Sequence, residues 1–208
     1  MKKEQKTPNL KISSHTLLQL YLYLISFITL GVLVIGIGLT SKVSLSYKIS
    51  IPFSYTLSTA NKEKDSIDYR DSEEFQECYS GEVMRFYNED FCFDKSERKT
   101  ELVTGISLIV SMSLLFGMHR YAISRISKQK SIVWIKKAYL FFSLLLYSLL
   151  TIILIPLTIY LLTSFFLFEP SPDMYYSPSA PAMSTATMIT TIPLWIYFLK
   201  KTTELKEK

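Results

Sequence analysis

The chain has 208 residues, with 23 basic and 18 acidic side chains and a formal net charge of +5. Charged residues are absent from residues 12–41, 102–119, 138–168 and 174–199. A soluble domain would intersperse its charges, whereas a bilayer core about 30 Å thick requires runs of about 20 apolar residues. The composition therefore excludes an ordinary soluble protein and predicts an α-helical integral membrane protein with four transmembrane helices.

The sign of the charge alternates along the chain, from +3 in residues 1–14 to −4 in 42–101 and +6 in 120–137. Lysine and arginine accumulate in cytoplasmic loops of membrane proteins. We therefore expect a multi-pass protein of the inner (cytoplasmic) membrane with both termini in the cytoplasm. Lipid headgroups account for the basic excess, so no nucleic-acid partner is expected. The predicted cytoplasmic segments are 1–14, 120–137 and 200–208, the spans 15–41, 102–119, 138–168 and 182–199, and the outer segments 42–101 and 169–181.

The first span contains an apolar run over residues 17–39. This run is longer than the roughly 7–15 residues of a signal-peptide core, which predicts a retained anchor. Gly31, Gly36 and Gly38 lie in its outer half, where small residues let another helix approach closely. We therefore expect these glycines to take part in helix packing.

The outer segment 42–101 begins with a strict alternation. From Val43 to Leu57 every odd position is apolar and every even position is Ser, Lys, Pro or Thr. A period of two predicts β-structure, and Pro52 predicts a bend or a break into two strands. Residues 83–87 and 91–93 could supply further strands. The expected result is a small β-rich extracytoplasmic cap between the first two helices, too small for an independent core and therefore resting on the helix ends.

The two cysteines of the chain, Cys78 and Cys92, both lie in this outer segment. Thiols outside the cytoplasm commonly pair, so a structural disulfide is predicted. The alternative is a redox or metal site, but the spacing is not that of a CxxC motif and no histidine lies on the same side.

The second span and the basic segment after it carry two further patterns. Small residues recur four apart, which favours helix packing through Ser107, Ser111, Ser113 and Gly117. Six basic residues then follow without an acidic one: Arg120, Arg125, Lys128, Lys130, Lys136 and Lys137. They are predicted to bind anionic lipid headgroups, at about 1 kcal/mol per charge. The alternative is that they act only as a topology signal.

The third and fourth spans differ in polarity. The third contains Pro156, which interrupts the hydrogen-bond ladder of a helix. The fourth is the richest in Ser and Thr, so we expect neighbouring helices to shelter it from lipid.

Two stretches give the chain a resemblance to a known family. They are VSLSYKISIPFSYTL at residues 43–57 and RISKQKSIVWIKKAYLFF at residues 125–142. In this layout the chain resembles an uncharacterised family of bacterial four-span membrane proteins, a domain of unknown function. It lacks the Gly-x-x-Phe expected in the basic hairpin of that family, and the resemblance implies no activity.

No motif points to catalysis. GxSxG, HExxH and Walker A patterns are absent, and the four spans contain none of the acidic or basic residues typical of proton and ion pathways. We therefore expect no catalytic residue, no metal site, no cofactor and no enzymatic activity. The leading hypothesis is an accessory or structural subunit of a larger membrane assembly, which presents its outer cap to a membrane-protein partner or forms a homo-oligomer. The alternatives are a toxin-immunity or ligand-sensing protein and a small channel or transporter component.

Overall fold

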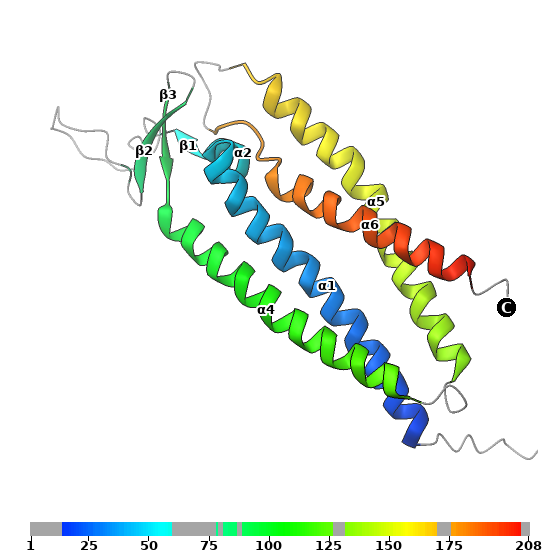
Figure 1. The fold of residues 1–208 in the computed structure, drawn as a ribbon. Helices are drawn as coiled ribbons and strands as arrows, with labels where there is room; N and C mark the ends of the chain where they lie inside the picture. The colour runs from blue at the N-terminus through cyan, green and yellow to red at the C-terminus, as the bar shows by residue number, and fades with distance from the viewer. Residues whose placement is uncertain are drawn as a thin grey trace, which may run out of the picture.

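The computed structural model describes residues 14–59, 78, 81–86, 89–126, 132–169 and 176–204. Within these residues four helices are long and apolar enough to span a membrane, as predicted. They are α1 (Ser14–Lys48), α4 (Lys95–Arg125), α5 (Val133–Phe166) and α6 (Ala182–Thr203). A short helix, α2 (Ile51–Ser54), and a three-stranded sheet lie at one end of the bundle (Figure 1).

Helix α1 occupies the centre of the bundle (Figure 1). It packs along α4 on one side and against α6 and α5 on the other, and α5 and α6 pack together. Helices α1 and α5 begin, and α4 and α6 end, at the end of the bundle opposite the sheet. The three segments with a basic excess therefore border the same end, as the charge pattern predicts.

The outer surfaces of the helices are apolar and their contacts are partly polar. Large aliphatic side chains such as Val110 on α4 and Ile152 on α5 are exposed, at 64% and 67%. Polar side chains such as Ser26 on α1 and Thr191 on α6 are buried, both at 0% exposure. This is the reverse of a water-soluble protein and is the distribution expected of helices surrounded by lipid.

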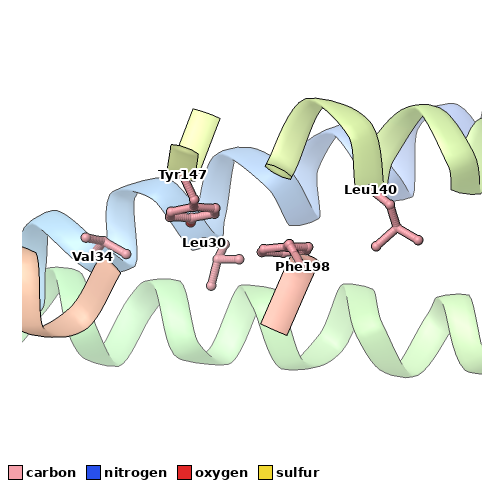
Figure 2. Close-up of a cluster of buried hydrophobic side chains, with 5 residues drawn as sticks. All are labelled: Leu30, Val34, Leu140, Tyr147 and Phe198. Atoms are coloured by element: carbon pink, nitrogen blue, oxygen red, sulfur yellow. The ribbon is translucent and has the colours of Figure 1, made fainter. Parts of the chain in front are cut away.

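The apolar core joins α1, α5 and α6 at the middle of the bundle. Tyr147 of α5 stacks on Phe198 of α6 with ring centroids 5.5 Å apart, and Leu30, Val34 and Leu140 complete the cluster (Figure 2). The fourth span is therefore sheltered as expected, because its buried face meets both neighbours.

Two glycines set the crossing of α1 and α4. A methyl group on Gly36 would lie 2.9 Å from the Leu108 Cβ and 3.2 Å from the Gly105 carbonyl oxygen. A methyl group on Gly105 would lie 2.5 Å from the Thr40 Oγ1 atom. Gly38 similarly faces Met183 and Thr187 of α6. The predicted packing roles of Gly36 and Gly38 thus correspond to real contacts, and the partner glycine on α4 was missed.

The remaining predicted packing residues make no such contact. A methyl group on Gly31 or Gly117 would meet nothing within 4 Å. Ser107, Ser111 and Ser113 are exposed on α4. These residues lie on sides of α4 that do not contact α1, so their role in helix packing stays a prediction.

The predicted β-structure of residues 43–57 is wrong. Helix α1 continues to Lys48, α2 follows, and the first strand, β1 (Ser58–Thr59), begins only after the predicted run. Burial contradicts the alternation, since the apolar Tyr47 is 64% exposed while Ser46 is buried. The helix prevails because its last turns pack on the start of α4, where Lys42 pairs with Glu101 and Arg98 lies over the Tyr47 ring. The helix accommodates its serines, since the Ser46 hydroxyl donates to the Val43 carbonyl at 2.6 Å.

Pro52 does mark a break in the chain. The helix α1 ends before it, and Pro52 takes its place in the first turn of α2, where proline is tolerated. Ser50 caps that turn by accepting a hydrogen bond from the Phe53 N–H at 3.3 Å.

The cap sheet has the strand order β1-β3-β2, with β2 (Glu82–Phe86) and β3 (Glu89–Phe93) forming an antiparallel hairpin. This confirms the two further strands that were predicted. The sheet covers a small cluster of Tyr55, Leu57, Phe91 and Phe93. The cap is tied to the bundle through the α5–α6 connection, because Leu57 and Ser177 exchange hydrogen bonds of 2.7 and 2.8 Å.

Candidate functional site

A cavity of about 650 Å³ opens near the end of the bundle opposite the sheet. All four long helices contribute to its walls. It exists because α4 packs along α1 and, among the described residues, has no comparable interface with α5 or α6. Helix α4 is therefore separated from the α5–α6 pair. The gap between them, which α1 also lines, forms the cavity.

Three basic side chains line this cavity, and each comes from a different helix. They are Arg120 near the end of α4, Lys136 in the first turn of α5 and Lys201 in the last turn of α6. The lining contains no carboxylate. Lys201 forms an ion pair of 2.8 Å with Glu204, whereas Arg120 and Lys136 make no ion pair with any described residue. The cavity therefore carries a net positive charge.

The rest of the wall is mainly apolar and aromatic. Below the basic residues it consists of Leu30, Phe116, Leu140 and Leu194 with the rings of Tyr139 and Phe198. Leu194 precedes Lys201 by seven residues, which is about 10 Å along a helix. The cavity thus combines a cationic rim with an apolar floor.

A second hollow of about 400 Å³ lies between α1 and α5, and its lining is wholly apolar or aromatic. It includes Phe27, Trp134 and Phe142. Tyr23 and Tyr139 line both hollows, and their rings lie in contact with centroids 5.2 Å apart. This tyrosine pair forms the shared wall.

The predicted headgroup-binding residues separate into groups. Arg120 and Lys136 line the cavity, while Lys137 is exposed outside the lining. The guanidinium of Arg125 lies over the ring of Tyr121 on its own helix, 4.9 Å from the centroid. The remaining two, Lys128 and Lys130, fall outside the described residues.

Lys201 was not predicted as part of this site. Its only signal in the sequence is its position directly after the fourth apolar run, at the end of the bundle where the basic hairpin also lies. Lys201 lines a cavity because a gap between helices lies beside it. The position of that gap depends on tertiary packing and cannot be seen in the sequence.

At the opposite end of the bundle, three residues form a compact polar cluster. The Lys42 ammonium donates to Glu101 Oε1 at 2.7 Å, and the Tyr55 hydroxyl donates to Glu101 Oε2 at 2.9 Å. Lys42 also lies over the Tyr55 ring, 4.2 Å from its centroid. Burial, reinforced by the hydrogen bond to Glu101, raises the pKa of Tyr55 above its usual value of 10.0. This Lys42–Glu101–Tyr55 cluster joins α1, α4 and the cap.

The predicted disulfide between Cys78 and Cys92 is confirmed, with Cα atoms 5.5 Å apart. Cys92 lies in the central strand β3, where it pairs with Ser58 on one side and Val83 on the other. The disulfide therefore has a structural role, because it links the segment before β2 to the central strand of the sheet.

Within the described parts of the chain, no three His, Cys, Asp or Glu side chains come together in a group that could hold a metal ion. The hydroxyls of α6 that motivated the channel alternative bond to carbonyls of their own helix. Thr187 donates to Met183 at 2.8 Å and Thr191 to Thr187 at 2.6 Å. The polarity of α6 is thus satisfied locally and does not require a water-filled path.

No protein-family model, curated protein sequence or solved structure matches this chain.

Proposed function

We propose that this chain is a non-enzymatic accessory subunit of a larger assembly in a bacterial cytoplasmic membrane, and that α4 carries its partner-binding face. The observation that supports this most is the one-sided packing of α4. Of its 31 residues only Gly105 is buried, although the helix is apolar enough to span a membrane. The other three long helices each bury several residues.

The exposed side of α4 has the composition of a helix-packing surface. Ser107 and Ser111 are one turn apart and both exposed, so they lie on the same side of the helix. Small residues at this spacing let a second helix approach closely, and van der Waals packing is the main attraction between helices in lipid. The expected occupant is a transmembrane helix of a partner protein or of a second copy of this chain.

The test is to enlarge the small residues of this face. We expect the wild-type chain, extracted in a mild detergent, to carry a stoichiometric partner in native mass measurements. The double variant Ser107→Ile/Ser111→Ile should lose that partner while keeping its thermal stability. Thr163→Ile, which enlarges an exposed small residue on α5, is the matched control and should keep the partner. A wild-type chain that runs as a clean monomer would contradict the proposal.

The orientation is also a proposal, supported by the clustering of the basic segments at one end of the bundle. We infer that this end faces the cytoplasm and that the sheet faces outward. In intact cells treated with a mild reductant, a membrane-impermeant thiol reagent should label Cys78 and Cys92. It should not label a cysteine introduced by Ser124→Cys in a chain whose native cysteines are replaced by serine. The opposite labelling pattern would reverse the topology.

The toxin-immunity or ligand-sensing alternative depends on the acidic part of the cap, residues 61–77, which lies outside the described residues. It stays a prediction, and a linked toxin gene whose product kills cells lacking this chain would favour it over the accessory role.

A further inference from the structure

The geometry points to a binding site for one anionic phospholipid in the cavity between α4, α5 and α6, with the phosphate held among Arg120, Lys136 and Lys201. This inference rests on the cavity and its charge and is independent of any partner on the outer face of α4. It requires only that the four helices lie in a membrane.

Charge complementarity is the first argument. Three cations from three helices converge on one hollow whose lining has no carboxylate, and two of them are without an ion-pair partner among the described residues. Like charges brought together in this way repel each other unless an anion lies between them. A phosphodiester offers acceptor oxygens to a guanidinium and to ammonium groups at once.

The apolar floor is the second argument, and it separates a lipid from a soluble anion. The wall continues about 10 Å below the basic rim. Leu194 lies at that depth, Phe116 and Leu140 lie about 6 Å below Arg120 and Lys136, and Leu30 of α1 completes this part of the wall. A free phosphate would leave this surface in contact with water, whereas an acyl chain covers it. The order of a charged rim above an apolar wall also matches the order of headgroup and acyl chain in a leaflet.

The chain offers a matched control for each of the three cations. Arg125, Lys137 and Lys200 lie on the same three helices as Arg120, Lys136 and Lys201 and carry the same charges, but none of them lines the cavity. The triple variant Arg120→Gln/Lys136→Gln/Lys201→Gln and the control triple Arg125→Gln/Lys137→Gln/Lys200→Gln therefore remove equal charge from the same end of the bundle.

The experiment is a titration of the delipidated full-length chain in a non-ionic detergent. Dioleoylphosphatidylglycerol, dioleoylphosphatidylcholine and inorganic phosphate are added in turn, and bound ligand is counted by native mass spectrometry and by equilibrium dialysis. We expect one phosphatidylglycerol per chain, held by the wild type and by the control triple. The cavity triple should bind it at least about tenfold more weakly, because each cation near a headgroup contributes about fivefold.

A further variant tests the acyl-chain part of the site. Ile123 lines the cavity on α4, and Ile123→Trp fills part of it while leaving the three cations in place. It should weaken phosphatidylglycerol binding without reducing any binding of inorganic phosphate.

Three outcomes would overturn the inference. Equal losses in the two triples would show diffuse surface charge rather than a site. Equal binding of phosphatidylcholine would show that the cations are not used. Displacement of phosphatidylglycerol by inorganic phosphate, with no effect of Ile123→Trp, would identify the ligand as a soluble anion.

Discussion

At the scale of single residues, the Lys42–Glu101–Tyr55 cluster is the most concentrated set of polar interactions in the described part of the sheet end of the bundle. The Lys42 and Glu101 side chains are only 15% and 21% exposed, so their charges are largely removed from water. A partly buried ion pair is sensitive to the loss of either partner, because the remaining charge is left unpaired. Removing a charged member of the cluster should therefore cost more stability than removing the tyrosine hydroxyl.

Removing the Tyr55 hydroxyl tests one bond of this cluster. Tyr55→Phe should lower the free energy of unfolding by about 2 kcal/mol, since a hydrogen bond to a charged group is lost. Glu101→Gln should cost more, about 3 kcal/mol, because it leaves Lys42 without its counter-ion. Thermal or denaturant unfolding in detergent measures both. A larger loss for Tyr55→Phe than for Glu101→Gln would contradict this ranking.

The same tyrosine predicts a dependence on pH. Its pKa is raised in the folded chain, so above pH 10 the folded state holds a proton that the unfolded state has lost. The contribution of Tyr55 to stability should be constant below pH 10 and should decline as the pH rises above it. Melting temperatures of the wild type and Tyr55→Phe, compared between pH 8 and pH 11, should converge at the alkaline end. A difference between the two melting temperatures that stays constant over this range would contradict the prediction.

At the scale of elements, replacing glycine by alanine should have opposite effects on stability at different positions of the bundle. Gly36→Ala and Gly105→Ala should each destabilise the chain by about 1–3 kcal/mol, because the added methyl group meets the backbone or Thr40 of the facing helix. Gly31→Ala and Gly117→Ala should be neutral or stabilising by up to about 1 kcal/mol, since alanine is the better helix former. Detergent-unfolding midpoints of the four variants measure this contrast, and equal effects at all four sites would rule out the packing described for α1 and α4.

The disulfide acts on the cap more than on the helices. Cys78→Ser/Cys92→Ser should reduce the stability of the sheet by about 3 kcal/mol, as expected for a loop of this length. Limited proteolysis should then cut residues 79–94 faster while the four helices stay protected. Cleavage within the helices at the same rate would show instead that the disulfide stabilises the whole chain.

Prediction from sequence succeeded where the constraint is local along the chain. The thickness of a bilayer fixes the length of an uncharged run, so the four helices could be located by counting. The charged first turns of α4, from Lys95 to Glu101, escaped this count because they extend beyond the apolar run and are held by contacts with α1. The alternation in residues 43–57 was ambiguous, because serine also fits into a helix when its hydroxyl bonds to a carbonyl of that helix.

At the scale of the whole molecule, the candidate site shows more clearly what could not be predicted from the sequence. Arg120 and Lys136 were predicted to meet lipid headgroups, but nothing in the sequence joins them to Lys201 or separates them from Lys137 and Arg125. That selection follows from the packing of α4 along α1 and not against α5 or α6, and from the hollow that results. Crossing angles depend on side chains from two helices at once, such as Gly36 and Gly105, and a single sequence read along one helix does not contain that pairing.

The central position of α1 bears on how the protein is made. This helix precedes all the others in the chain, and α4, α5 and α6 each pack against it. During synthesis α4 and α6 therefore each meet a surface of α1 that is already present, whereas α5 gains its main partner only when α6 has been made. A defect in α1 would correspondingly remove contacts from all three later helices and leave α5 and α6 to pack on each other alone, which makes this helix the point at which quality control of the nascent chain has most to detect.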